Sequence, residues 1–421
     1  TLLAALLVIF WWQRGTLAWR RDVLPLLPLF ALAAAAGVLT AVCEVKFIGA
    51  QGAAFDLSLL DSVLIAGRTI WFYLGKLVWP ANLIFVYPRW QIEPSDWRQY
   101  LFPLAAAGLL AVAWAMRKRR RGPLAALLFF VGTLFPALGF CHVYPFVYSF
   151  VADHFQYLAS LGVITLFSAA ATTLWRRRSG GQPRTAGGVA LSVTLLLVLG
   201  VLTWRQSSTY ANVQDLYRTT IDHTPECWMA ELNLGGCLAD QSRFDEAMPH
   251  YQRALEIRPN CVEAVNNLGT AAAALGRTDE AIAHYKEAMK IKPDYADAYF
   301  NLGNLMDRLG RLDEAIGYYQ QAIEHEPQYS KAYNNLGSAL LRKGFAEDAI
   351  VCYRGALECR PDYAMAWNNL ADAYAAAGRL PEALSAARQA LEFANAQGNS
   401  RLATAARERV AAYSRQTSAQ P

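Results

Sequence analysis

Charged residues are scarce in this chain, and several motifs of enzyme chemistry are missing from it. Asp, Glu, Lys and Arg make up 17% of the 421 residues, against about a quarter in a typical soluble domain. No CxxC pair, HExxH motif, GxSxG turn or glycine-rich phosphate loop occurs, which leaves zinc, thioredoxin, hydrolase and nucleotide chemistry without support. The seven cysteines are scattered, so we expect reduced core side chains, no disulfide scaffold and no metal site.

The two halves of the chain differ in charge and in hydropathy. Residues 1–204 hold 17 Lys and Arg against 7 Asp and Glu, whereas residues 205–421 hold 22 against 27. The basic residues of the first half stand beside apolar runs, so we expect no nucleic-acid partner. The length predicts at least two domains. The apolar opening at Thr1 predicts that the chain begins inside a longer membrane domain.

Six apolar runs of nearly spanning length predict a polytopic membrane domain of helices over residues 1–204. The runs are 1–12, 23–42, 100–116, 123–143, 157–175 and 188–204. Arg-rich loops follow the first, third and fifth runs, and all three fall on one side if each run crosses once. That side is predicted to be cytoplasmic, which places residues 205–421 on the other side of the membrane.

Two further segments of the first half carry candidate functional residues. Residues 55–87 are apolar, but counting them as a span breaks the charge pattern, so we predict a helix at the outer interface. Four of its side chains lie close to one face at helical spacing: Arg68, Trp71, Phe72 and Lys76. They are either snorkelling cations with aromatic anchors or a cationic stripe toward a lipid phosphate. Asp153 and His154 stand at the mouth of a span, where ionisable groups either serve function or face water in the headgroup zone.

A period of 34 residues runs through the second half, marked by Pro225, Pro259, Pro293, Pro327 and Pro361. This is the period of tetratricopeptide (TPR) repeats, which stack helix pairs into a solenoid. Aligned Gly, Ala, Leu and Tyr columns fill the space between helices, with Ala371 and Ala387 as departures. We predict a linker with a degenerate leading helix over 205–227 and five repeats over 228–397. A capping helix and tail over 398–421 should expose Arg407, Glu408 and Arg409 to water.

One asparagine in each repeat precedes the aligned Leu: Asn233, Asn267, Asn301, Asn335 and Asn369. In the TPR proteins that this chain resembles, this position faces the concave groove. A side-chain amide both donates and accepts hydrogen bonds. We therefore predict that the column points into water and binds extended protein or peptide acceptors without regard to their sequence. The alternative is that Asn is merely common at this position of the repeat.

Three membrane-domain motifs followed by TPR repeats resemble the transmembrane-and-TPR protein O-mannosyltransferase family and its bacterial relatives. The motifs are WFYLGKLVWP at 71–80, YPRW at 87–90 and ADHFQYLASLG at 152–162. The resemblance covers about residues 20–400. It implies a GT-C type glycosyltransferase that needs no cofactor. Such an enzyme uses a polyprenyl-phosphate sugar as co-substrate at the outer face and glycosylates Ser or Thr of proteins.

Sugar transfer to a hydroxyl needs a carboxylate base and donors for the leaving phosphate. Lys76, Arg89 and His154 are the outer-face candidates for the donor phosphate, although relatives often carry Arg in the motif that has His154 here. The resemblance implies that the family's principal acidic pair lies before the start of this chain. The catalytic residue is therefore unknown, and Asp153 is a substitute candidate.

The alternative function is a non-enzymatic, membrane-anchored TPR scaffold for protein–protein interaction. Both functions imply membrane lipid and protein or peptide partners. Both also imply an integral protein of a bacterial inner membrane, with the repeats outside the cytoplasm.

Overall fold

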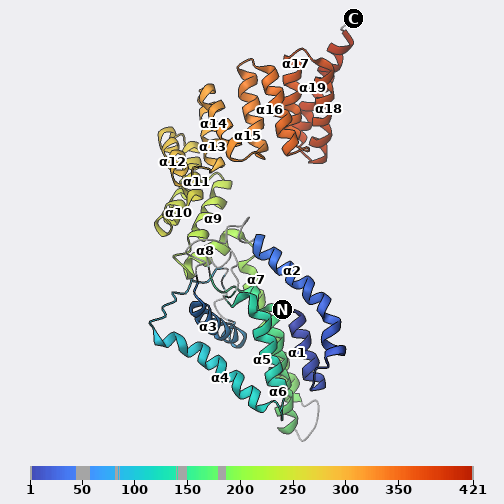
Figure 1. The fold of residues 1–421 in the computed structure, drawn as a ribbon. Coiled ribbons are helices and arrows are strands. Elements are labelled where there is room, and N and C mark those ends of the chain that lie inside the picture. Colours follow the sequence, from blue (N-terminus) through green and yellow to red (C-terminus); the bar gives the residue numbers. More distant parts are fainter. Residues whose placement is uncertain are drawn as a thin grey trace. The chain divides into compact units, whose positions relative to one another are not determined.

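The computed structural model describes residues 2–43, 57–80, 84, 86–138, 140, 149–178 and 186–419. Within these ranges the chain consists of helices, turns and irregular segments without a strand, which confirms the predicted all-α class. The chain divides into two compact units, Thr1–Ala230 and Glu231–Pro421, whose helices are labelled in Figure 1. The apolar helices belong to the first unit, and the repeats form the solenoid of the second.

The helices of the first unit follow the apolar runs of the sequence. They are α1 (Leu2–Arg14), α2 (Leu27–Cys43), α3 (Leu59–Val78), α4 (Leu101–Met116), α5 (Gly122–Leu134), α6 (Tyr157–Arg178), α7 (Ala186–Thr209) and α8 (Val213–His223). Three segments are long and apolar enough to cross a membrane: Trp19–Cys43, Trp97–Met116 and Tyr157–Trp175. Three shorter apolar helices are Leu2–Arg14, Gly122–Ala137 and Leu196–Arg205. These six correspond in position to the six predicted runs, although the fourth helix is described only to Ala137.

Two of the Arg-rich loops meet at one end of the first unit. Gly15 has a left-handed φ of +81°, and a Cβ at this position would overlap the Arg121 guanidinium. Asp22 is 1% exposed, and it forms ion pairs with Arg14 and Arg21. Figure 1 shows the last turns of α1, α4 and α6 at the same end of this unit. The first two loops thus share one end of this unit, and the third loop lies largely outside the described residues.

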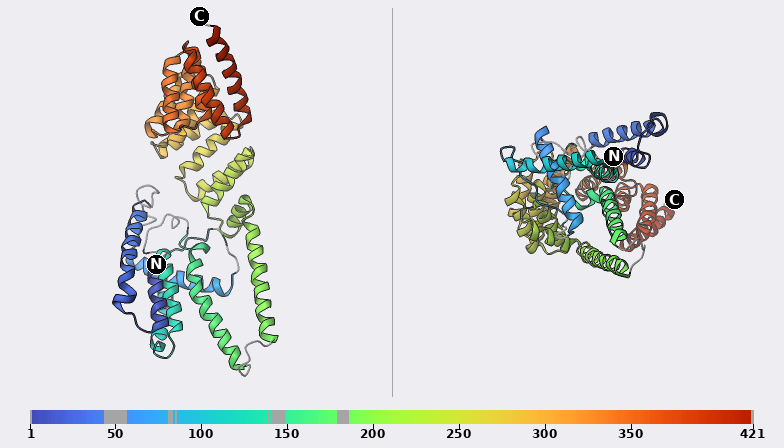
Figure 2. Two further views of the ribbon diagram at one scale, coloured as in Figure 1. Left: turned by 90° about the vertical axis from the view of Figure 1, so that its right-hand side faces the viewer. Right: turned by 90° about the horizontal axis from the view of Figure 1, so that it is seen from below.

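The second unit is built from helix pairs. The first helices of the pairs are α9 (Trp228–Asp240), α11 (Val262–Ala274), α13 (Ala296–Arg308), α15 (Ser330–Arg342) and α17 (Ala364–Ala376). The second helices are α10 (Phe244–Ile257), α12 (Thr278–Ile291), α14 (Leu312–His325), α16 (Ala346–Cys359) and α18 (Leu380–Ala396), and α19 (Ser400–Ala419) follows them. Figure 2 shows the stacked pairs from two further sides. We number each repeat from residues 228, 262, 296, 330 and 364, so the aligned Asn is position 6, the aligned Gly position 8 and the aligned Tyr position 24.

Each position-24 tyrosine packs directly on the position-8 glycine of its own repeat. A Cβ built on Gly235, Gly269, Gly303 or Gly337 would lie 2.6–2.9 Å from a carbon of that ring. The four tyrosines are 1–2% exposed. In repeats 2 to 4 their hydroxyls reach position 9, where they bond Thr270 at 3.3 Å, Asn304 at 2.9 Å and Ser338 at 3.1 Å. The glycine therefore admits the ring, and in the fifth repeat both members of the pair are alanine, Ala371 and Ala387.

The last helix, α19, closes the solenoid by packing on α17 and α18. Arg409 donates from Nε and Nη2 to the Asp372 carboxylate at 2.6 and 2.7 Å, and the Tyr413 hydroxyl donates to the same group at 2.8 Å. The expectation that Arg409 faces water is wrong, because it is half-buried and paired with Asp372. Arg407 and Glu408 are exposed, as predicted.

Candidate functional site

The first helices form the inner surface of the solenoid. The helices α11, α13, α15 and α17 contact one another in series, and α17 contacts α19. The second helices of neighbouring repeats contact one another less. The first helices therefore lie on the inside of the curve, and they carry the five position-6 asparagines, all of them half-buried.

Position-6 amides join neighbouring repeats through the residue at position 5. Asn301 Nδ2 donates to Asn266 Oδ1 of the preceding repeat at 3.0 Å, and Asn369 Nδ2 donates to Asn334 Oδ1 at 3.0 Å. Both acceptors are 5% exposed. The expectation that the position-6 side chains only point into water is therefore wrong for Asn301 and Asn369, because the amide of each donates one hydrogen bond to a neighbouring helix.

The fourth repeat follows a variant of this pattern, because position 5 of the third repeat is Phe300. Asn335 Nδ2 donates instead to Asn304 Oδ1 at 2.8 Å, and this oxygen also accepts from the Tyr319 hydroxyl at 2.9 Å. Asn368, at position 5 of the last repeat, is 4% exposed, and its Oδ1 has no partner among the described residues. The position-5 asparagines were not predicted from the sequence; the Asn-Asn doublets at 266–267, 334–335 and 368–369 are the signal that could have found them.

Positions 5, 6 and 9 of the first helices offer neutral polar groups on the inner surface. Positions 5, 6 and 9 of the five repeats carry no Lys or Arg. The one acidic residue at these positions, Asp372, is held by Arg409 and Tyr413. Within the described part of the chain, the Asn233 and Asn267 side chains form no hydrogen bond with another residue. These two amides are the members of the column that keep their full hydrogen-bonding capacity for a ligand.

A second candidate site lies in the first unit, where aromatic rings of the first two motifs gather beside α3 with Phe150, which stands just before the third motif. Phe72 makes edge contacts with Tyr73, Tyr87 and Trp90, with ring centroids 5.2, 4.9 and 5.8 Å away. Trp90 in turn lies 6.5 Å from Phe150. We call these five rings the aromatic cluster. Trp71 turns away from it toward α4, where its Nε1 donates to the carbonyl of Phe102 at 3.0 Å.

Three cations lie over rings of the aromatic cluster. Lys76 Nζ is 5.2 Å from the Tyr87 centroid, Arg68 is 4.5 Å from Trp90, and Arg89 is 4.9 Å from Phe150. The structure thus places two predicted phosphate candidates, Lys76 and Arg89, at one cluster. It also places Arg68 there, which was predicted only as part of a stripe. Cations held over aromatic faces are stabilised by the ring quadrupole.

Tyr73 ties the third motif to α3. Its buried hydroxyl donates to the carbonyl of Ala152 and accepts from the backbone N–H of the same residue, both at 3.0 Å. Asp153 and His154 follow directly, at the start of the helical turn Asp153–Gln156. Their side chains lie outside the described part of the structure, so the roles assigned to Asp153 and His154 stay predictions.

Arg89 also borders a cavity of about 170 Å³. Val86, Pro88, Thr224 and Cys227 contribute to its lining, and Thr224 Oγ1 donates to the carbonyl of Val86 at 3.3 Å. Burial lowers the pKa of the Arg89 guanidinium. The residues described contain no group of three or more His, Cys, Asp or Glu side chains arranged to hold a metal ion.

Families of known repeats match the second half of the chain. A family described as TPR repeat matches residues 271–310. Families described as tetratricopeptide repeat match residues 228–261, 296–329 and 328–396. Residues 228–396 are therefore built from tetratricopeptide repeats, which confirms the predicted repeat class. No curated protein matches the chain.

Solved TPR proteins are similar to this chain over its repeats. MamA is 27% identical, with 39% of this chain and 97% of MamA covered and a TM-score of 0.35. TTC0263, a thermophilic TPR protein of Thermus thermophilus, is 27% identical, with 42% and 98% covered and a TM-score of 0.37. YrrB, described as a TPR protein with an unusual peptide-binding site, is 22% identical, with 46% and 97% covered and a TM-score of 0.35.

Proposed function

We propose that this chain is a membrane-anchored TPR protein whose inner surface binds an extended stretch of polypeptide. The observation that carries the proposal is the column of position-6 amides, one in every repeat, on the helices of the inner surface. Stacked repeats create the extended concave surfaces that solenoid proteins use for partners. An amide at each step can donate to a backbone carbonyl and accept from a backbone N–H.

The chemistry of the inner surface favours recognition of backbone over side chains. Amides, hydroxyls and apolar groups occupy positions 5, 6 and 9, together with the paired Asp372. Positions 5, 6 and 9 carry no cation, so these positions give a free terminal carboxylate no advantage over an internal segment. Asn301, Asn335 and Asn369 each donate one amide hydrogen to the preceding repeat and keep the second for a ligand. These bridges hold the amides in place before binding, which lowers the entropy cost of association.

In the finer form of the proposal, the bound polypeptide is the acceptor of a sugar carried by a polyprenyl phosphate. Its support is the resemblance of the three motifs together with their meeting at the aromatic cluster. Lys76 and Arg89 would contact the donor phosphate there, because fixed cations stabilise the charge that develops on a leaving phosphate. Tyr73 would hold the segment that leads to Asp153 and His154. Membrane lipid is the second partner in this form.

The alternative is a non-enzymatic scaffold in which the repeats hold a protein at the membrane. The regular repeats favour it, because they provide a binding surface that needs no chemistry. Incubating the full chain in micelles with a mannosyl polyprenyl phosphate and a Ser- and Thr-rich peptide separates the two. Mannose on the peptide, or binding of the polyprenyl phosphate by this chain, supports the enzyme, whereas peptide binding with neither transfer nor donor binding supports the scaffold.

Binding to the inner surface is tested with the two asparagines that have no role between repeats. Each amide pair with a backbone is worth about 0.5–1.5 kcal/mol. Asn233→Ala combined with Asn267→Ala should therefore lower the affinity for a blocked, Ser- and Thr-rich peptide about tenfold, as measured by titration calorimetry. The amidated and free-acid forms of the peptide should bind the wild-type chain equally.

Asn266→Ala combined with Asn334→Ala is the matched control, because it removes two buried acceptors between repeats and leaves the position-6 column complete. It should lower the thermal midpoint and affect binding much less. If the Asn233 and Asn267 variant binds the peptide as tightly as the wild-type chain while circular dichroism shows intact helices, the column does not hold the ligand.

The donor site is tested with farnesyl phosphate and the full chain in micelles. Lys76→Ala and Arg89→Ala should each lower the affinity for farnesyl phosphate and leave the affinity for the peptide unchanged. Arg98→Ala is the control, since Arg98 is an exposed cation of the 3-10 helix Trp97–Tyr100. Equal affinity for farnesyl phosphate in all four proteins would mean that these cations only anchor the fold at the aromatic cluster.

A further inference from the structure

Eight cations gather at the end of the first unit where the first two Arg-rich loops meet. We call residues 14–22 and 117–121 the basic end of this unit. They hold seven Arg and one Lys against one acidic residue, Asp22, which gives a net charge of +7. Arg20 and residues 118–121 are exposed, and these five side chains form no ion pair with a residue that the structure describes. Most of this positive charge is therefore open to a ligand.

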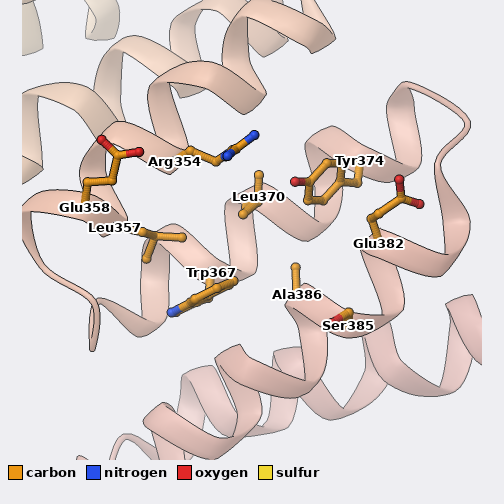
Figure 3. A pocket seen from close by; sticks show the side chains of 9 residues that line it. All are labelled: Arg354, Leu357, Glu358, Trp367, Leu370, Tyr374, Glu382, Ser385 and Ala386. Atoms are coloured by element: carbon orange, nitrogen blue, oxygen red, sulfur yellow. The ribbon is translucent and has the colours of Figure 1, made fainter.

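The hollow between α16, α17 and α18 of the second unit has the opposite property, because its charges balance (Figure 3). Its volume is about 400 Å³, and three charged side chains line it. Glu382 pairs with Arg379 at 3.0 Å, which leaves Glu358 against Arg354. This hollow offers no net charge to select a ligand, whereas the basic end does.

A buried carboxylate fixes the first loop of the basic end. Asp22 accepts from the backbone N–H of Ala18 at 2.8 Å. Arg21 donates to it from Nε and Nη2 at 3.0 and 3.1 Å, and Arg14 pairs with it as well. The Arg14 and Arg21 side chains are still 42% and 60% exposed. Because both side chains are held in place, they present their remaining N–H groups to a ligand at a small cost in entropy.

Arg121 joins the second loop to the first. Its guanidinium lies against Gly15, where a Cβ would overlap it. The backbone N–H of Gly15 donates to the carbonyl of Trp11 at 2.7 Å, so the last turn of α1 fixes the place against which Arg121 lies. Helices α1 and α5 are in contact on the same side of this unit. Cations from two distant segments of the sequence therefore belong to one structured surface.

Tryptophan rings and apolar helices mark the depth at which this surface lies. The apolar segment Trp19–Cys43 begins within the basic end, and the segment Trp97–Met116 ends directly before residue 117. Trp19 and Trp114 are exposed, and Arg117 lies over the Trp114 ring at 4.1 Å. Tryptophan rings at the ends of spanning helices sit at the level of the lipid headgroups. The cations therefore stand at the level of the phosphates of one leaflet.

We propose that the basic end is a structured binding site for the phosphates of anionic phospholipids such as phosphatidylglycerol. The proposal rests on the membrane anchoring that is part of the proposed function. A guanidinium can donate two parallel hydrogen bonds to a phosphate, and clusters of Lys and Arg beside a spanning helix attract anionic headgroups. Nucleic acid also carries phosphates, but the adjoining tryptophans and apolar segments favour a lipid.

The probes are phosphatidylglycerol and, as the neutral reference, phosphatidylcholine with the same acyl chains. Native mass spectrometry of the full chain released from neutral detergent micelles gives the affinity for the first lipid of each kind. The wild-type chain should prefer phosphatidylglycerol about tenfold, and Arg121→Gln should lower the affinity for this lipid about fivefold. Arg98→Gln is the matched control, because it removes an exposed Arg just before the start of α4, and it should change nothing.

Gly15→Ala tests the structured site without changing any charge. Its Cβ should displace the Arg121 guanidinium and lower the affinity for phosphatidylglycerol about threefold. Lys76→Ala combined with Arg89→Ala should leave this affinity unchanged, and Arg121→Gln should leave the affinity for farnesyl phosphate unchanged. These two results would separate the basic end from the candidate donor site at the aromatic cluster.

Flotation with vesicles of pure phosphatidylcholine tells a failure of the anchoring from a failure of this site. The wild-type chain and Arg121→Gln should both float, whereas a chain that stays behind contradicts the anchoring. The lipid site is overturned if the chain floats and Arg121→Gln binds phosphatidylglycerol as tightly as the wild-type chain. An effect of Arg121→Gln without one of Gly15→Ala would mean attraction by net charge alone, which also overturns the structured site. Displacement of the lipid by glycerol phosphate or by a single-stranded RNA would assign the cations to a soluble ligand and overturn the lipid.

Discussion

The first four repeats and the fifth fill the space between their two helices in different ways. In repeats 1 to 4 a glycine at position 8 admits a buried tyrosine from position 24, and in repeats 2 to 4 its hydroxyl bonds position 9. The fifth repeat has alanine at both places. Its position-9 residue, Asp372, instead accepts from the Tyr413 hydroxyl of α19.

Position 9 therefore meets a phenol hydroxyl in repeats 2 to 5, although the phenol comes from a different helix at the end of the solenoid. In the fifth repeat the phenol hydroxyl comes from the capping helix α19, whereas in repeats 2 to 4 it comes from the second helix of the repeat itself. The difference indicates that the residues at positions 8 and 24 depend on each other. Glycine at position 8 goes with tyrosine at position 24, and alanine goes with alanine.

The largest expected loss of stability comes from converting the third repeat to the pattern of the fifth. Tyr319→Ala removes a ring that is 1% exposed and should cost about 3–5 kcal/mol of unfolding free energy. Gly303→Ala alone should cost about 1–3 kcal/mol, because its Cβ would overlap that ring. In the Tyr319→Ala background the same glycine change should stabilise by up to about 1 kcal/mol, since alanine is the better helix former.

Urea unfolding of the solenoid, expressed as residues 228–421, measures this double-mutant cycle. The reverse cycle is made in the fifth repeat. Ala387→Tyr alone should destabilise the solenoid, and it should destabilise the solenoid less when it is combined with Ala371→Gly. Additive changes in both repeats would mean that the two columns vary independently and are not coupled.

The period and its columns allowed the whole solenoid to be predicted, because each repeat meets the same packing demand. Ala387 was recognised as a departure from the Tyr column, but its link to Ala371 was not. A glycine's need for space depends on a ring sixteen positions away, and that contact follows from how two helices cross. The Arg409 pair with Asp372 was missed for the same reason, because the amphipathic pattern of α19 does not say what covers it.

The sequence allowed many residues of the candidate sites to be predicted, but not the contacts between them. The position-6 column follows from the repeat, whereas the bridges to Asn266 and Asn334 depend on amide orientation across a helix interface. In the first unit, spacing put Lys76 near Phe72. It gave no means of placing Arg89 over Phe150, because those residues come from segments whose packing is decided in three dimensions.

Alkaline pH should test the buried phenols that the first four repeats carry at position 24. Burial raises the pKa of Tyr251 and that of Tyr353 to about 12. The folded state then holds the phenol proton more tightly than the unfolded state does. The stability contribution is therefore complete below the unfolded pKa of about 10, and it is lost as the pH rises toward 12.

Tyr251→Phe keeps the ring and removes the titrating group, so it should flatten the alkaline fall of stability by about 1 kcal/mol per pH unit. At neutral pH it should change little, because no hydrogen bond from the Tyr251 hydroxyl is found in the described residues and position 9 of this repeat is Gly236. Urea midpoints measured at several pH values give the slope. An identical slope in both proteins would place the alkaline sensitivity in other groups.

The smallest expected effect concerns the turn between the two helices of each repeat. Position 15 is glycine in repeats 2 to 5, with φ between +75° and +88°, whereas the first repeat has Ser242 at φ +61°. A Cβ in this left-handed region approaches the following carbonyl, at a cost of about 1–2 kcal/mol, and glycine offsets part of that gain through its larger unfolded-state entropy. Ser242→Gly should therefore stabilise the solenoid by about 0.5–1 kcal/mol. Gly310→Ser is the reverse change and should destabilise by a similar amount, so opposite shifts of the urea midpoint at equal slope are expected. A loss of stability on Ser242→Gly would mean that the serine makes the first turn different from the other four, and not merely more strained.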